Sequence, residues 1–157
     1  MKSILLIYSF LLTIILPNNL NMAFAQTSKE CTGICGTIVF KSGNLMPSPD
    51  IGVGVGGNSG KPVVREIVIY ELTKMSDAES DGPFFRSLKT REIKRVKSDK
   101  KGTFSVTLPP GKYSVLVKED KGLFANISDG DNNINPVAVE KGKMTKLDLV
   151  VDYAAAY

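Results

Sequence analysis

Three oxygen-bearing side chains, Asp129, Asp131 and Asn133, alternate along one polar segment and are the residues best suited to bind a metal ion. Hard oxygen donors at such positions open calcium-binding loops, because one irregular turn directs them to the same cation. Glu140 occupies the twelfth position counted from Asp129, but it follows a predicted strand, and the sixth position is Ile134 instead of glycine. We therefore expect a tight Asp/Gly/Asn turn, with calcium binding as the alternative.

A second group of carboxylates, Asp77, Glu79 and Asp81, lies in a polar connection nearer the N-terminus. Two acids that face each other across a sugar hydrolyse glycosidic bonds, provided that one of them has a raised pKa. Nothing in the sequence desolvates these three, so we interpret them as solvated, and a carboxylate-based hydrolase is a minor alternative. The chain has no histidine, which excludes Ser-His-Asp and Cys-His catalysis and histidine-ligated zinc. We expect no enzyme activity and no resident cofactor.

The chain has two cysteines, Cys31 and Cys35. Their spacing is not the C-x-x-C of a redox-active pair, which argues against catalytic thiols. We predict a structural disulfide between them, with free or intermolecular thiols as the alternative. The bridge requires a bend at Thr32-Gly33, since four residues of extended chain would hold the two Cα atoms about 13 Å apart.

Two adjacent aromatic residues, Phe84 and Phe85, precede Arg86 in the same acidic and polar connection. Neighbouring side chains of a strand point to opposite faces, so both rings can be buried only if the connection folds back over an edge of the sandwich or begins the next strand early. Otherwise one ring faces solvent. An exposed ring beside an arginine is typical of an interface anchor. The competing interpretation, which we prefer, is that both rings fill the core of a small domain that has no tryptophan.

Three glycines, Gly52, Gly54 and Gly57, match the letters of the nucleotide-binding motif G-x-G-x-x-G. That motif requires a strand before it and a helix after it, so that backbone amides cradle a pyrophosphate. Neither element is predicted here, and the segment is interpreted as a turn-rich loop.

The N-terminus has the three parts of a secretory signal peptide: Lys2, the apolar run from Ile4 to Leu16, and the triplet Ala23-Phe24-Ala25. Thirteen apolar residues are fewer than the roughly 20 that span a bilayer, so we expect cleavage before Gln26 and no membrane span in the mature chain. The protein is therefore expected to be secreted, periplasmic or attached to the cell surface. The chain divides into a leader (1–25), a segment with the cysteine pair (26–35) and one domain (36–157).

Composition agrees with one packed domain, with 43% hydrophobic and 23% charged residues. The formal net charge is +4, but basic residues are interleaved with acidic ones, as in the segment 91–95. Such interleaving is typical of a solvated strand face, and we expect no nucleic-acid partner.

Apolar residues come in short β-branched and aromatic runs without helical spacing, which predicts an all-β domain. The clearest signal is Thr103 to Leu108, where Phe104, Val106 and Leu108 alternate with polar residues. About seven strands and close turns predict a two-sheet sandwich. The predicted strands are Gly36 to Lys41, Val63 to Leu72, Thr90 to Ser98, Thr103 to Leu108, Lys112 to Lys118, Val137 to Val139 and Met144 to Tyr153.

The segment from Lys97 to Val115, with an Asp/Gly turn, a strand containing Phe104, then Pro110-Gly111 and Tyr113, resembles the carboxypeptidase regulatory-like family. The resemblance covers most of Gly36 to Val151 and implies a prealbumin-like or Ig-like β-sandwich that serves as an accessory module. The chain also resembles small exported single-domain proteins of Bacteroidetes-type bacteria, through the segments 46–50 and 65–72 and the Ala-Gln cleavage site.

These observations together predict a secreted, non-enzymatic β-sandwich that binds a protein or a cell-surface glycan. The alternatives are a structural component of the envelope and, with less support, a calcium-dependent binding module or a carboxylate-based hydrolase.

Overall fold

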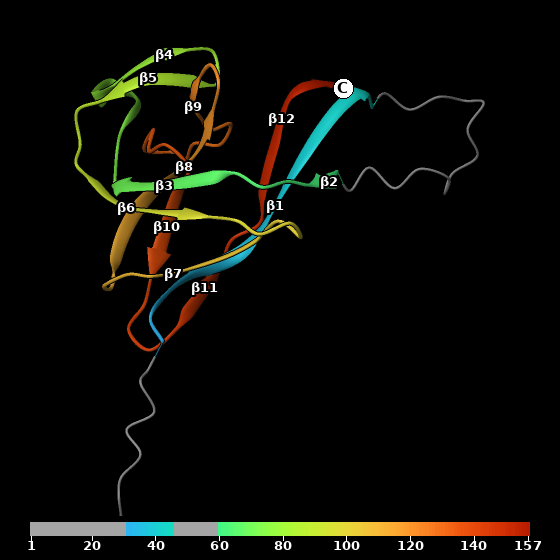
Figure 1. The fold of residues 1–157 in the computed structure, drawn as a ribbon. Coiled ribbons are helices and arrows are strands. Elements are labelled where there is room, and N and C mark those ends of the chain that lie inside the picture. The colour runs from blue at the N-terminus through green and yellow to red at the C-terminus, as the bar shows by residue number, and fades with distance from the viewer. Residues whose placement is uncertain (1–30, 46–59) are drawn as a thin grey trace, which may run out of the picture.

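The computed structural model describes residues 31–45 and 60–157. The predicted leader and the three glycines of the nucleotide-type motif lie outside these residues. Within them the chain is almost entirely strands, arranged in two sheets of five and seven strands. The prediction of an all-β two-sheet sandwich is confirmed (Figure 1).

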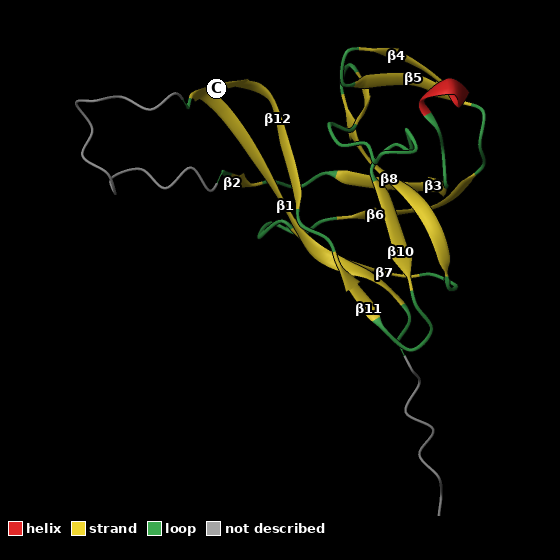
Figure 2. Cartoon of the chain, turned by 180° about the vertical axis from the view of Figure 1, so that it is seen from behind, coloured by secondary structure: helices red, strands yellow, loops and turns green. Residues whose placement is uncertain are grey.

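The five-stranded sheet is organised around one long strand, β1 (Gly33–Asn44). One edge of β1 pairs antiparallel with β7 and β2, and β1 also pairs parallel with β11 and β12. β1 and β12 run side by side as a ribbon that extends to one side of the sandwich (Figures 1 and 2). The partner strands are β2 (Lys61–Pro62), β7 (Thr103–Thr107), β11 (Met144–Lys146) and β12 (Leu149–Ala156).

The seven-stranded sheet has the order β4-β5-β9-β8-β3-β6, with β10 also paired to β8. Its central strand, β8, lies between β3 on one edge and β9 and β10 on the other. A short 3-10 helix (Met75–Asp77) precedes β4. The strands are β3 (Glu66–Glu71), β4 (Ala78–Asp81), β5 (Phe84–Leu88), β6 (Glu92–Lys97), β8 (Gly111–Glu119), β9 (Gly122–Phe124) and β10 (Pro136–Val139).

The main core draws on both sheets, because alternate residues of each strand point inward. Ile34, Ile38 and Val151 of the five-stranded sheet are completely buried, as are Ile69 and Val115 of the seven-stranded sheet. Burial of aliphatic side chains of this size contributes about 1.5–3 kcal/mol each. This interior holds the two sheets together.

A second, smaller cluster covers the opposite face of the seven-stranded sheet, outside the sandwich. It consists of Phe85, Leu116, Ala125 and Ile134. Leu116 lies between the inward-facing residues of β8, so its side chain points to this outer face. The segment after β9 therefore folds back over the sheet and gives it a hydrophobic layer on both sides.

The number of strands was underestimated, since residues 31–45 and 60–157 form twelve where about seven are predicted. The polar connection Thr73 to Lys89 contains the hairpin of β4 and β5, and β9 follows the turn after β8. The last predicted strand is interrupted at Leu147 and Asp148, which separate β11 from β12, and both parts pair parallel with β1. β4 is mostly polar and exposed, and the other additional strands span only two to five residues.

Candidate functional site

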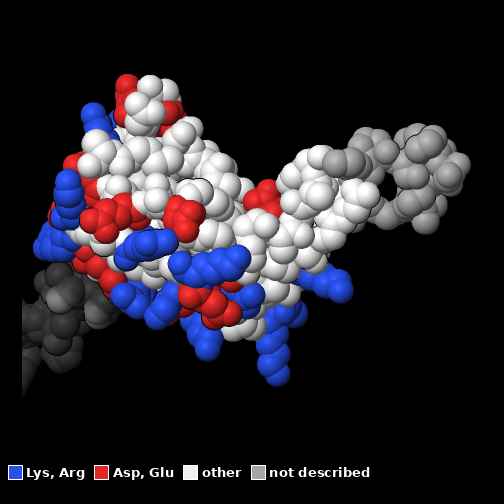
Figure 3. All heavy atoms as spheres, turned by 90° about the horizontal axis from the view of Figure 1, so that it is seen from above, with Lys and Arg blue, Asp and Glu red and all other residues white. Residues whose placement is uncertain are grey.

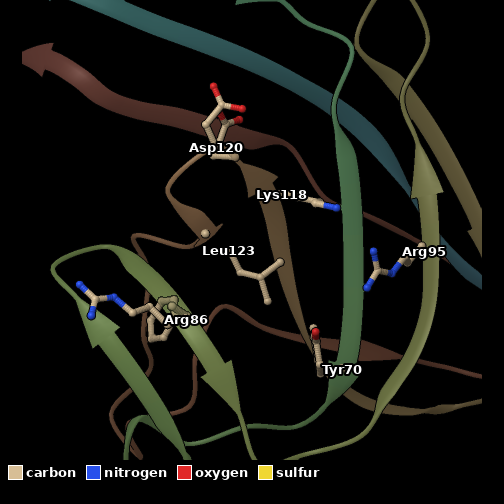
Figure 4. Close-up of a pocket in the computed structure, with 9 residues that line it drawn as sticks. Tyr70, Arg86, Arg95, Lys118, Asp120 and Leu123 are labelled. Atoms are coloured by element: carbon tan, nitrogen blue, oxygen red, sulfur yellow. The ribbon is translucent and has the colours of Figure 1, made fainter.

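The outer face of the seven-stranded sheet carries a groove of about 340 Å³. It crosses the sheet from β5 over β9 and β8 to β3 and β6 (Figure 4). We call it the outer groove and define it by its lining residues: Tyr70, Phe85, Arg86, Arg95, Lys118, Glu119, Asp120, Gly122 and Leu123.

The floor of the outer groove is apolar and aromatic. Tyr70 of β3 and Leu123 of β9 are partly exposed, and both pack against the second hydrophobic cluster, which contains Phe85. Desolvation raises the pKa of Tyr70 above its ordinary value, and the carboxylate of Glu92 raises it further. The Tyr70 hydroxyl is therefore a neutral hydrogen-bonding group at physiological pH.

Two cations of the outer groove belong to one ion-pair network that also involves acids beside the groove. Arg95 of β6 donates to Glu92 at 2.5 Å from Nε and 2.7 Å from Nη2, and its Nη1 lies 3.3 Å from Glu66. These hydrogen bonds raise the pKa of Arg95 and lower that of Glu92. Lys118 of β8 is held more loosely, with Nζ 3.6 Å from the Glu66 carboxylate. Arg95 is therefore fixed in direction, and Lys118 keeps more freedom.

The third cation, Arg86 of β5, lies on the opposite side of the groove from Arg95 (Figure 4). Its Nη2 is 3.1 Å from the carboxylate of Asp81, and both side chains are largely exposed. Exposed ion pairs of this kind contribute only about 0–1 kcal/mol. The Arg86 guanidinium is thus available to another anion.

One end of the groove is acidic, with Glu119 and Asp120 at the end of β8. The Glu119 side chain is only 4% exposed and accepts a hydrogen bond of 2.7 Å from Arg65 Nε and one of 3.1 Å from the Tyr153 hydroxyl. Its charge is therefore satisfied inside the protein. Asp120, at the same end, points away from Tyr70 and Arg95 (Figure 4).

A second hollow of about 430 Å³ adjoins the outer groove at Arg95, which lines both. Its other lining residues are Glu66, Val96 and Lys97. Seen from above, basic and acidic side chains are interleaved over the body of the sandwich, without a broad area of one sign (Figure 3).

The three residues of the alternative calcium loop, Asp129, Asp131 and Asn133, lie together and hydrogen-bond to one another. Asp129 Oδ1 accepts backbone hydrogen bonds from Asp131 at 3.0 Å and Asn133 at 2.8 Å, and its Oδ2 accepts one of 2.8 Å from the Asn133 amide. These bonds, and the nearby charge of Lys112, lower the pKa of Asp129. The segment has the tight turn that we expected, and Glu140 forms an ion pair with Lys143 elsewhere.

The remaining acids, Asp77, Glu79 and Asp81, lie on the 3-10 helix and on β4. Glu79 and Asp81 are exposed, and Asp81 pairs with Arg86. Among residues 31–45 and 60–157, no group of three or more His, Cys, Asp or Glu side chains is placed to hold a metal ion.

Phe84 and Phe85 are both buried, which agrees with the preferred interpretation that both rings fill the interior, but the two rings belong to different hydrophobic clusters. Phe84 is 9% exposed in the main core and Phe85 is 1% exposed in the second cluster. β5 has apolar layers on both faces, so neighbouring side chains can point in opposite directions and both be buried. Arg86 alone of the three predicted interface residues is exposed, and it lines the outer groove together with Phe85.

The predicted disulfide is also wrong, since Cys31 and Cys35 are free thiols. The chain does not bend back at Gly33, because β1 begins there and pairs with β7 and β11 through Cys35. A Cβ atom built on Gly33 would lie 2.0 Å from the carbonyl oxygen of Val106, so glycine serves the close approach of β7 and not a turn.

Tyr70, Arg95, Lys118 and Leu123 were not predicted as site residues. None of their strands has a strict alternation of buried and exposed residues, and β3 and β8 each contain a continuous run of buried residues. Their proximity depends on which strands pair, and only the β3-β8 and β3-β6 registers bring Tyr70, Arg95 and Lys118 to one face.

Comparison of the chain with protein-family models, with curated proteins and with solved structures gives no match. Within the residues that the structure describes, no helix has the length and apolar character needed to cross a membrane.

Proposed function

We propose that the chain is a secreted, non-enzymatic binding module that takes its ligand in the outer groove, with a cell-surface glycan as the preferred ligand and a protein as the alternative. The observation that carries this proposal is the open groove with a tyrosine floor and cations from three different strands. Aromatic and arginine side chains dominate the energetics of binding surfaces.

The chemistry of the groove supports binding more than catalysis. Of its two acids, Glu119 is nearly buried and bonded to Arg65 and Tyr153. General acid-base catalysis requires an acid whose proton can be exchanged with a substrate. The groove lining supplies polar and aromatic contacts instead, as expected of a recognition surface. The resemblance to the carboxypeptidase regulatory-like family, whose members are usually accessory modules, agrees with this proposal.

The test is a binding screen of the purified protein against bacterial and host polysaccharides and envelope proteins. We expect one saturable ligand, and we expect the double variant Arg86→Ala/Lys118→Ala to lose at least tenfold in affinity. The matched control is Lys100→Ala/Lys141→Ala, which removes two exposed charges from turns outside the groove. Absence of any saturable ligand, or equal loss in the control, would favour the structural role in the envelope.

We also propose that the leader is removed during export. Mass spectrometry of the extracellular or periplasmic protein should give a chain that begins at Gln26. A cytoplasmic species that retains Met1 would contradict export, without bearing on what the groove binds.

A further inference from the structure

We propose that the ligand of the outer groove is a carboxylate-bearing saccharide, such as a uronic acid residue of an acidic polysaccharide. This inference rests on the proposed function and adds the chemical class of the ligand. It follows from the charges that remain accessible in the groove, from the shape of its floor and from the pairing of the strands beneath it.

The residues that line the groove include more cations than exposed acids. Its lining contains Arg86, Arg95 and Lys118 against Glu119 and Asp120. The Glu119 carboxylate is not accessible to a ligand, because it is buried and accepts hydrogen bonds from Arg65 and Tyr153. Within the lining, three cations therefore stand against one exposed acid, which lies at one end (Figure 4). Each cation also has an acidic partner beside the groove, Asp81 for Arg86, Glu92 and Glu66 for Arg95, and Glu66 for Lys118.

Two of the cations have N–H groups that can donate hydrogen bonds to a ligand carboxylate. Among the described residues, Arg86 contacts only Asp81, at 3.1 Å, so most of its five N–H groups are open to a ligand. Lys118 Nζ lies 3.6 Å from Glu66, beyond ordinary hydrogen-bond distance. Arg95, by contrast, uses each of its three side-chain nitrogens to bind Glu92 or Glu66, and it contributes its fixed position. Arg86 and Lys118 are thus the expected carboxylate-binding residues.

The floor favours a sugar ring over a peptide. The strands beneath it, β9, β8 and β3, are paired on both edges, so they offer no free backbone to which an extended peptide could add as a strand. Tyr70 presents a partly exposed ring and a neutral hydroxyl. An amphipathic aromatic side chain can pack against the apolar C–H groups of a sugar while its hydroxyl bonds to the sugar hydroxyls.

The experiment compares polygalacturonic acid with its carboxyl-reduced form, which has the same sugar backbone without the charge. Isothermal titration calorimetry at 0.15 M salt should give an affinity at least tenfold higher for the acidic polymer. Arg86→Gln and Lys118→Gln should each reduce that affinity about tenfold, whereas Lys141→Gln, the control, should leave it unchanged. Circular dichroism and the thermal midpoint verify that every variant is folded.

The outcomes separate this inference from the proposed function. Equal affinity for the acidic and the reduced polymer, lost in the Arg86 and Lys118 variants, would overturn the carboxylate inference and leave the groove as a glycan site. Equal affinity for poly-glutamate would overturn the preference for a saccharide. If neither polymer nor any other glycan or protein of the screen binds, both proposals fail.

Discussion

Glu119 connects the two sheets through a single carboxylate. It stands at the end of β8, accepts a hydrogen bond from Arg65 before β3 and another from Tyr153 of β12, and is almost fully buried. A buried charge is tolerated only where such partners satisfy it. The same side chain also ends the outer groove, so its position affects both stability and the shape of the site.

Removal of this carboxylate should destabilise the protein measurably. Glu119→Ala leaves Tyr153 and Arg65 without their shared acceptor, and hydrogen bonds to charged groups contribute about 1.5–3 kcal/mol. Because the Arg65 side chain is 33% exposed and can be rehydrated, we expect a loss within that range in urea denaturation. Glu79→Ala, which removes an exposed acid of β4, should change the free energy of unfolding by less than about 0.5 kcal/mol. Similar values for both variants would contradict the assigned role.

Asp148 should make stability depend on acid pH. A hydrogen bond of 2.8 Å from the Thr37 hydroxyl is the main reason that the pKa of Asp148 lies below its ordinary value of 3.8, with Lys146 contributing. The charged form therefore stabilises the folded state at pH values above 3.8, and this contribution is lost as the pH falls through the lower folded-state value. Asp148→Asn should flatten the pH dependence of the unfolding free energy below pH 4, compared with Asp77→Asn; unchanged curves would argue against this contribution.

At the scale of elements, β5 is the clearest case of a strand buried on both faces. Phe84 faces the main core and lies 5.0 Å from the Tyr153 ring, centroid to centroid, whereas Phe85 faces the second cluster. Phe84→Ala and Phe85→Ala should each lower the free energy of unfolding by about 3–5 kcal/mol. Arg86→Ala, on the same strand, should cost little stability, because its side chain is 69% exposed. If either substitution lowers the free energy of unfolding only slightly, the neighbouring residues of that cluster must move to fill the cavity left by the missing ring.

β1 lies very close to the residues that link β11 to β12, and Gly36 makes this close approach possible. A Cβ atom on Gly36 would lie 1.8 Å from the carbonyl oxygen of Leu147, a distance that requires the backbone to move. Overpacking of this kind costs about 1–3 kcal/mol or more. Gly36→Ala should therefore lower the thermal midpoint, whereas Gly130→Ala should not, since no atom lies within 4 Å of its Cβ position. An unchanged midpoint for Gly36→Ala would contradict the close approach.

Sequence patterns identified those elements whose residues alternate against one core. The strand with Phe104 and Val106 was predicted within one residue of its observed bounds, because its burial alternates strictly. β4, β5 and β9 were missed, since they pack against a second cluster formed only after distant segments fold over the outer face. For the same reason the outer groove could not be predicted: Arg86 was singled out, but its neighbours Tyr70 and Lys118 come from strands whose pairing the sequence does not reveal.

At the scale of the whole molecule, the pairing of the first strand, β1, with the last, β12, determines whether the sandwich forms. β12 pairs parallel with β1, and a hydrogen bond joins Thr37 to Asp148 across 111 residues of sequence. Loops of this length carry a high entropic cost before their contacts form, which slows folding. β12 in turn places Leu149 and Val151 in the main core.

Truncation after Lys146 should therefore abolish folding instead of leaving a smaller stable domain. It removes Leu149 and Val151 from the main core and Tyr153 from the ring cluster with Phe40, Phe84 and Phe124. Each buried side chain contributes about 1.5–3 kcal/mol, and a domain of this size has a total stability of about 5–15 kcal/mol. Loss of the β1 pairing adds to this deficit. Circular dichroism and urea denaturation should show no cooperative transition for the truncated chain, whereas deletion of Tyr157 alone, which is 64% exposed, should preserve it. A cooperative transition in the truncated chain would mean that the seven-stranded sheet and its two hydrophobic layers fold without β12.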